Sequence, residues 1–214
     1  MAALDSVAVS DRVQIPIGTP MFNNAASIEK LSQTIKEKAG NKKLFVIAIS
    51  GFGGAGKSTV ALELAKAIGN SNLVELDDFI LNRLSKRSAD WDGFDWGRLI
   101  SQVLEPIRNG EKNIEYDIYD WGNNKLGRKN KIKVSKYVIL EGVGLIQEKL
   151  NKFFDYKIWV NVQPEIAKER GRKRDKGMGA DHDTFWDDKW SLNDKDYFEK
   201  HNPMSYADYI IPNI

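Results

Sequence analysis

Residues 51–58 read Gly-Phe-Gly-Gly-Ala-Gly-Lys-Ser and match the phosphate-binding pattern G-x-x-x-x-G-K-[ST]. The flanking sequence has the order that this pattern requires. An apolar stretch of strand length, Leu44–Ile49, precedes the loop, and a helical pattern, Thr59–Ile68, follows it. A glycine-rich turn that binds nothing is the alternative interpretation, and the agreement of motif and context disfavours it. The motif therefore predicts an α/β domain with a phosphate site where a strand ends.

Each part of this loop has a physical role in holding a nucleotide. Glycines let the backbone curl so that its N–H groups point at an anion, and the following helix adds its free N–H groups and positive dipole end. Lys57 would place its charge on the β- and γ-phosphates, and the Ser58 hydroxyl would bind Mg²⁺. We therefore expect ATP and Mg²⁺ as cofactors. The expected nucleotide-binding residues are Gly51, Gly53, Gly54, Ala55, Gly56, Lys57, Ser58 and Thr59.

Composition disfavours several other classes of function. The chain has 214 residues, a net charge of +2 and no cysteine, so one α/β domain accounts for its length. The small charge gives no support for a nucleic-acid or membrane partner. The lack of cysteine excludes disulfides and thiolate metal sites and agrees with a reducing cytoplasm, where we expect the protein to work. We expect a small-molecule partner and leave homo-oligomerisation open.

Elsewhere the apolar pattern alternates between strand and helix, which predicts a mainly parallel sheet covered on both faces. Residues 1–24 are expected to be an irregular extension, and residues 25–214 a single domain. The segment 114–134 is polar and rich in turn residues, and we expect short strands at its two ends only. The expected helices cover 27–39, 96–108, a stretch opening at Pro164, and 186–200; the expected strands cover 44–49, 73–76, 137–140, 157–162 and 209–211.

Acidic residues stand where two of the expected strands end. Asp77 could face the γ-phosphate and accept the proton of an attacking hydroxyl, or it could cap a helix. Glu141 could hold Mg²⁺ through water, or it could cap the helix expected near Leu145. The residues alone do not separate these alternatives. Because ligands of parallel α/β sheets bind beyond the carboxyl ends of the strands, both carboxylates are candidates for the nucleotide site.

Two further patterns carry candidate residues. Acids and aromatics alternate in 90–96 and 119–121, where aromatic faces could stack on a base and carboxylates could bind ribose. Trp121 is the better pocket candidate, whereas Trp96 and Trp159 are expected in the core. Arg170 and Arg174 share a helix face and could clamp phosphates as a lid, although a solvated charged face is the default. His182 and His201 are expected at the surface or in loops rather than as ligands.

Together these segments resemble the uridine kinase and phosphoribulokinase branch of P-loop kinases, from about residue 44 to residue 212. The resemblance rests on the P-loop and on the following ordered segments: Asp77–Ile80, Asp92–Asp95, Tyr119–Trp121, Glu141–Gly142, Arg170 with Arg174, and Tyr206–Pro212. It implies the α/β fold of P-loop NTPases, a three-layer sandwich with a mainly parallel sheet, a helical lid and a small insertion.

The resemblance also implies roles for individual residues. Asp77 would be the general base, and Lys57, Arg170 and Arg174 would neutralise the transferring phosphoryl group. Ser58 and Glu141 would bind the metal ion. The implied substrate contacts are Asp77, Phe79, Asp90, Asp92, Phe94, Tyr119 and Trp121, with the choice between Asp90 and Asp92 for the sugar left open.

The chain departs from the family pattern at two positions that concern the substrate. Ile80 replaces the tyrosine that helps to hold the sugar, and the histidine expected shortly after Asp120 is missing. The resemblance therefore implies ATP-dependent phosphorylation of a hydroxyl, with uridine or a related nucleoside as the first candidate. A kinase for another metabolite, such as pantothenate, a sugar phosphate or nicotinamide riboside, and a nucleotide-binding regulatory NTPase are the alternatives.

Overall fold

A five-stranded parallel sheet forms the centre of the structure, a computed structural model that describes residues 25–81 and 87–212. The strand order is β2-β5-β1-β6-β7, and every neighbouring pair is parallel, as the alternating pattern predicts. The extension expected over residues 1–24 lies outside the described residues. The strands are β1 (Phe45–Gly51), β2 (Ser71–Glu75), β5 (Tyr137–Glu141), β6 (Tyr156–Asn161) and β7 (Tyr209–Pro212).

Strand β1 lies in the middle of this sheet, and all its residues are buried. A continuous apolar strand is what a parallel sheet with both faces covered requires. The register pairs Ile49 with Glu141 on β5 and Gly51 with Val160 on β6. The P-loop and Glu141 are therefore brought to the same edge of the sheet, although they are far apart in the sequence.

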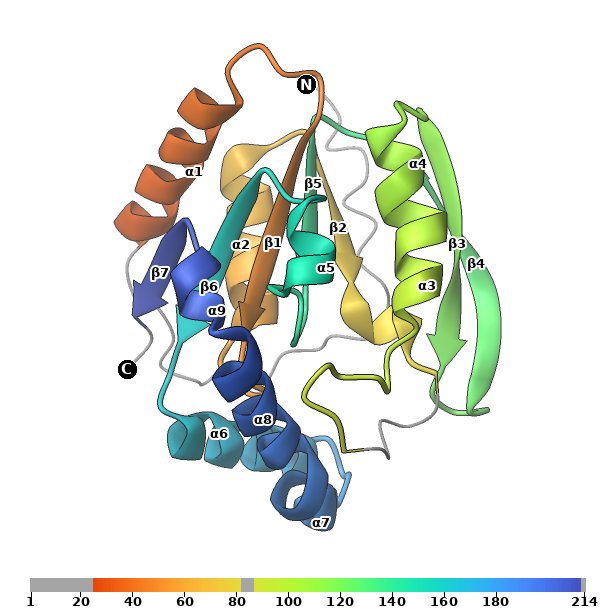
Figure 1. Cartoon of the computed structure of the whole chain (residues 1–214), viewed down its shortest axis with the longest axis vertical. Helices are drawn as coiled ribbons and strands as arrows, with labels where there is room; N and C mark the ends of the chain where they lie inside the picture. The colour runs from red at the N-terminus through yellow and green to blue at the C-terminus, as the bar shows by residue number, and fades with distance from the viewer. Residues whose placement is uncertain (1–24, 82–86, 213–214) are drawn as a thin grey trace.

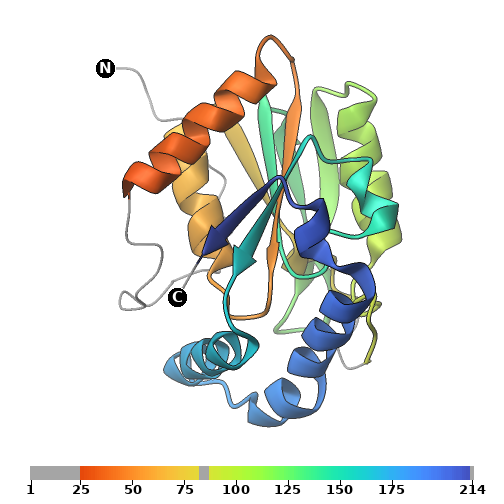
Figure 2. The same ribbon diagram turned by 60° about the vertical axis from the view of Figure 1, so that its left-hand side comes forward.

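Helices cover both faces of the sheet, which gives the expected three layers (Figures 1 and 2). One face carries α1 (Ala25–Ala39) and α2 (Lys57–Ile68); Leu31 and Ile35 of α1 are fully buried. The other face carries α5 (Glu148–Asn151) and the helical stretch expected over 96–108. That stretch forms as α3 (Trp96–Leu99), a wide π turn (Ile100–Leu104) and α4 (Glu105–Arg108).

The segment 114–134 differs from its expectation. It forms a hairpin of two long strands, β3 (Asn113–Asp120) and β4 (Lys125–Lys133), that lies outside the main sheet. Ile114, Tyr116 and Ile118 of β3 are buried and alternate with polar residues, which is the pattern of a strand with one face covered. The polar composition concealed this alternation. The hairpin is the small insertion that the fold class implied.

Helices also gather beyond the carboxyl ends of the strands, at the bottom of Figure 1. They are α6 (Pro164–Gly177), α7 (Asp183–Phe185), a π turn (Trp186–Trp190) and α8 (Ser191–His201). This layer stands where the helical lid was expected. After α8 the chain returns to the sheet, where α9 (Pro203–Tyr206) contacts β6. Within the part of the chain that the structure describes, none of the helices has the length and apolar character needed to cross a bilayer.

Candidate active site

The P-loop connects β1 to α2 and depends on glycine for its shape. Gly54 and Gly56 have φ angles of +80° and +92°, in the left-handed region that favours glycine. A Cβ atom on Gly51 would lie 2.7 Å from the carbonyl oxygen of Val160 on the next strand. Lys57 begins α2, and its Nζ donates a hydrogen bond to the carbonyl oxygen of Phe52 at 3.0 Å. The loop therefore closes on itself and presents a helix start to a phosphate.

Lys57 is buried, and carboxylates surround its charge. Burial lowers the pKa of its ammonium, whereas Glu141, Asp194 and Asp77 raise it. Buried charges are normally paired in this way, because an isolated ammonium would neutralise. The acids thus help to keep Lys57 charged.

Ser58 and Glu141 meet at the start of α2. The Ser58 hydroxyl donates a hydrogen bond to Oε1 of Glu141 at 3.1 Å, and burial raises the pKa of that carboxyl to about 7 against the lowering effect of Lys57. Hydroxyl and carboxylate oxygens are hard donors that suit Mg²⁺. Among the described residues, no group of three or more acidic, histidine or cysteine side chains could hold a metal. A Mg²⁺ ion at this pair would thus need phosphate and water oxygens to complete its shell.

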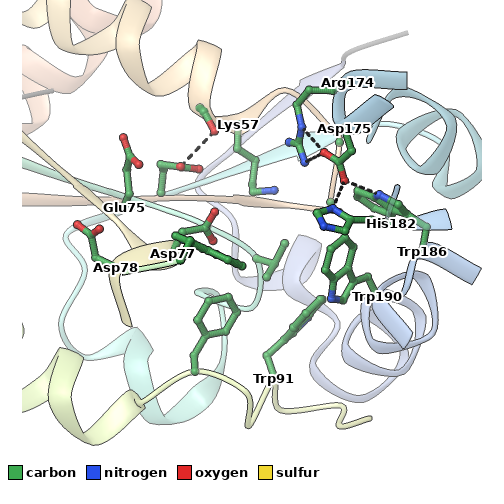
Figure 3. Close-up of a pocket in the computed structure, with 18 of the residues that line it drawn as sticks. Lys57, Glu75, Asp77, Asp78, Trp91, Arg174, Asp175, His182, Trp186 and Trp190 are labelled. Atoms are coloured by element: carbon green, nitrogen blue, oxygen red, sulfur yellow. Dashed lines mark hydrogen bonds and ion pairs between the residues drawn. The ribbon is translucent and has the colours of Figure 1, made fainter. Parts of the chain in front are cut away.

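Asp77 faces this centre from the neighbouring strand end. It lies on a 3₁₀ turn, Leu76–Phe79, directly after β2. The buried Arg98 supports the turn by donating to the carbonyl oxygen of Asp78 at 2.9 Å. The Asp77 side chain is exposed toward the pocket, and the pocket walls screen its carboxyl from bulk solvent. Desolvation therefore raises its pKa, and Lys57 and Arg174 oppose the rise (Figure 3).

Asp194 is a buried acid that contacts the P-loop from α8. Its Oδ2 accepts a hydrogen bond from the Gly53 N–H at 2.7 Å, and Oδ1 has no hydrogen-bond partner in the described structure. Burial raises the pKa of this carboxyl to about 7, while Lys57 and the Gly53 N–H lower it. This hydrogen bond thus joins α8, in the lid layer, to the phosphate loop.

A cavity of about 560 Å³ joins these groups. Its phosphate end is formed by Lys57, Ser58, Glu141 and the P-loop glycines. Aromatic side chains line the cavity as well, and Trp121 is one of them, as the sequence predicts, with 36% of its surface exposed. The lining residues beyond the P-loop are Glu75, Asp77, Asp78, Trp91, Phe94, Trp121, Glu141, Gly142, Val143, Arg174, Asp175, Met178, His182, Trp186 and Trp190.

Several sequence-predicted substrate residues lie away from this lining, which corrects their expected place. Phe79 is fully buried and stacks on Tyr116, so it belongs to the core. Tyr119 is also buried, and its ring packs edge-on against Trp121. Their side chains point to the core because β3 and the 3₁₀ turn pack against each other.

The two candidate sugar-binding acids are likewise placed elsewhere. Asp90 accepts hydrogen bonds from Lys200 at 2.5 Å and pairs with His201 at 2.7 Å, which ties the 88–95 loop to α8. Asp92 is exposed and accepts a hydrogen bond from the Ser88 hydroxyl. On the lid, Arg174 lines the cavity and Arg170 does not, although the two share a helix.

The lid supplies lining residues that the sequence analysis did not select. Asp175 is buried and accepts hydrogen bonds from Arg174 and from the Trp186 indole, the latter at 2.9 Å (Figure 3). The same carboxylate also lies 3.1 Å from Nδ1 of His182. His182 lies in the loop before α7, as expected, and also lines the pocket. The alternation of acids and aromatics in 90–96 includes Trp91, but that pattern favoured the acids as substrate contacts. Nothing in the sequence pattern indicates that Trp186 and Trp190 turn inward.

Comparison with known proteins finds uridine kinases among the relatives of this chain. A uridine kinase of Schizosaccharomyces pombe is 27% identical over 187 residues, covering 80% of this chain and 41% of that protein. A uridine kinase of Borrelia garinii subsp. bavariensis is 28% identical over 180 residues, covering 78% of this chain and 85% of the relative. This chain is related to the uridine kinase-like P-loop kinases. No protein-family model matches it.

Solved structures show that this kinase-like chain has the P-loop kinase fold. A "possible uridine kinase" from Bacillus stearothermophilus superposes with a TM-score of 0.67 at 18% identity, over 86% of this chain and 96% of that one. A D-glycerate 3-kinase from Cryptococcus neoformans var. grubii superposes with a TM-score of 0.60 at 12% identity, over 80% of this chain and 87% of that one. At such identities the likeness concerns the fold, so the neighbours do not decide the substrate.

Proposed function

We propose that this protein transfers the γ-phosphoryl group of ATP to a hydroxyl of a small molecule, with uridine or a related nucleoside as the first acceptor to test. The observation that carries the proposal is the single cavity in which Asp77 faces Lys57, Ser58 and Glu141. A base, a phosphate loop and a magnesium pair are the parts that phosphoryl transfer needs. The similarity to uridine kinases supports the same reaction.

Each residue has a stated task in this reaction. Asp77 accepts the proton of the acceptor hydroxyl as that oxygen attacks the γ-phosphorus. Lys57 and Arg174, both at the cavity, offset the negative charge that spreads over the phosphoryl oxygens. Ser58 and Glu141 would hold Mg²⁺, which neutralises charge on the β- and γ-phosphates. The lid layer excludes water, so that ATP is not hydrolysed in place of transfer.

The aromatic end of the cavity favours a kinase over a regulatory NTPase. A regulatory protein needs room for the nucleotide and one water, whereas this cavity continues past Asp77 to Trp91 and Trp121. Such a space matches a ring-bearing acceptor. Pantothenate and sugar phosphates remain alternatives within the kinase class.

The test is ADP release with ATP and Mg²⁺, measured with and without a panel of acceptors. Asp77→Asn keeps the size of the side chain but cannot take the proton, so kcat should fall by roughly 10²-fold or more with ATP binding nearly unchanged. Asp78→Asn is the matched control and should be milder. Stimulation by an acceptor that survives in Asp77→Asn would remove Asp77 from the mechanism. No stimulation by any acceptor would favour the regulatory NTPase.

A further inference from the structure

One carboxylate joins three segments of the lid at the cavity wall. Asp175, in the last turn of α6, is only 3% exposed, and both of its oxygens are engaged (Figure 3). Oδ1 accepts hydrogen bonds from Nε and Nη2 of Arg174 at 2.9 and 2.8 Å. Oδ2 accepts from the Trp186 indole at 2.9 Å and lies 3.1 Å from Nδ1 of His182. A buried carboxylate that holds this many donors fixes the direction of each of them.

The contact between Arg174 and Asp175 is not an automatic consequence of helix geometry. Side chains at i and i+1 on a helix do not face each other, so Arg174 bends toward its neighbour to form this pair. A guanidinium has more N–H donors than the two that Asp175 accepts. The Arg174 side chain remains 49% exposed and lines the cavity, where its other donors can bind a phosphate oxygen.

Arg174 also lies within electrostatic reach of the proposed reaction centre. Burial raises the pKa of the Asp77 carboxyl, Lys57 and Arg174 lower it, and Asp175 raises it. Burial likewise lowers the pKa of the Lys57 ammonium, and Arg174 adds to that lowering against the acids around it. The lid pair is therefore close enough to act on both the proposed base and the P-loop lysine. A guanidinium fixed at this place is preorganised for the charge that develops on a transferring phosphoryl group.

His182 belongs to the same wall and is oriented by the same carboxylate. An ionised carboxylate only accepts hydrogen bonds, so Nδ1 of His182 carries the proton in this contact. The ring packs edge-on against Trp190, with centroids 5.4 Å apart, which restricts its rotation further. The His182 side chain is 40% exposed and lines the cavity. In the neutral ring, Nε2 is then the nitrogen that can accept a hydrogen bond from a ligand.

We propose that Asp175 is a positioning residue of the transfer reaction, which holds Arg174 for the transferring phosphoryl group and His182 as a hydrogen-bonding contact for the acceptor. The proposal rests on the phosphotransfer proposed above and adds the residue that orients its acceptor contact. Trp186 extends the arrangement to the P-loop, because a Cβ atom on Gly53 would lie 2.9 Å from its ring. The alternative is that Asp175 only fastens the lid, in which case its loss would act independently of Arg174.

A double-mutant cycle separates positioning from packing. Asp175→Asn keeps the shape of the side chain, and kcat at saturating ATP, Mg²⁺ and acceptor should fall by about 10–10²-fold, the usual effect of a small misplacement in an active site. In an Arg174→Ala background the same substitution should cost less than about threefold, because the group that Asp175 positions is gone. An equal loss in both backgrounds overturns the proposal.

Asp187→Asn is the matched control for the loss of a lid carboxylate. Asp187 is exposed, pairs with Lys168 at 2.5 Å and lies outside the cavity lining. Its substitution should leave kcat within about twofold of wild type, as surface changes do. A thermal melt of each variant shows whether it is folded.

The acceptor contact is tested at His182, which is partly exposed and therefore tolerant of substitution. His182→Phe keeps a ring beside Trp190 but has no nitrogen. The acceptor KM, and the acceptor Kd measured by calorimetry, should therefore rise by about tenfold while the ATP KM is unchanged. His182→Gln, whose amide can take the place of Nε2, should lose less. Unchanged acceptor KM and Kd in His182→Phe overturn the proposal, and this measurement decides the matter if Asp175→Asn does not fold.

The acceptor in these assays is the compound that most strongly stimulates ADP release by the wild-type protein. If no compound does so, the kinase proposal fails and this inference fails with it. If an acceptor stimulates the wild type, but the losses in the cycle are equal or His182→Phe binds it normally, only the positioning role is refuted and the kinase proposal stands.

Discussion

At the scale of single residues, the proposed reaction relies on the charge of Lys57. Lys57→Ala should lower kcat by roughly 10²–10³-fold, the usual cost of losing one preorganised group that stabilises the transition state. Lys66→Ala is the matched control, because Lys66 is exposed in the last turn of the same helix. Steady-state ADP release and a thermal melt of each variant measure the effect. Unchanged turnover in a folded Lys57→Ala protein would contradict the assignment.

The raised pKa of the Asp194 carboxyl predicts that the stability of the fold depends on pH. Its pKa is about 7 in the folded protein and near 3.8 when unfolded, so the folded state binds more protons between these values. The free energy of unfolding therefore falls as pH rises through this window. The destabilisation by the ionised Asp194 carboxylate reaches its full size above about pH 7. Asp194→Asn keeps an oxygen acceptor for the Gly53 N–H but carries no charge.

The comparison is made by denaturant unfolding of both proteins from pH 4 to pH 8. The stability of Asp194→Asn relative to wild type should improve steadily with pH up to about 7 and then level off. A difference between the two proteins that does not change with pH would show that the Asp194 carboxyl has no raised pKa.

At the scale of elements, α6 packs on both the P-loop and Trp186 with no space to spare. A Cβ atom on Gly171 would overlap the Trp186 ring, whose indole N–H is fixed by Asp175. Gly171→Ala should therefore lower the free energy of unfolding by about 1–3 kcal/mol, as overpacking does. Gly177→Ala, on the same helix with open space around it, should be neutral or slightly stabilising. Chemical denaturation measures both, and equal stability of the two variants would contradict this packing.

The backbone amides of the lid segment 170–188 should become better protected from hydrogen exchange when substrates bind. The Trp186 ring of this segment lies against Gly53 of the P-loop, and lids of this kind close over bound substrates. Hydrogen exchange should slow over these residues when a non-hydrolysable ATP analogue and acceptor are both present, and stay constant over α1. Equal exchange of the segment in the free and doubly bound protein would count against its role as a lid.

At the scale of the whole molecule, nucleotide binding should stabilise the fold, because the cavity draws residues from β1, β2, β5 and the lid. A ligand at 100 times its Kd adds about 2.7 kcal/mol, which for a chain of this size is about 5–10 °C in Tm. ATP analogue with Mg²⁺ should give this shift by calorimetry. AMP, which lacks the β- and γ-phosphates, should give little, and a shift equal for both nucleotides would place binding elsewhere.

The P-loop, the parallel sheet and most helix positions could be predicted from the sequence, because they depend on local periodicity and on backbone freedom at glycines such as Gly54 and Gly56. The motif also sufficed to select Lys57 and Ser58. The wall of the acceptor pocket could not be predicted in the same way. Whether Tyr119 or Trp91 faces the cavity depends on how the hairpin, the 88–95 loop and the lid pack together, and neighbours of those residues are distant in sequence. The raised pKa of Asp194 has the same origin, since burial beside the P-loop exists only once α8 has docked.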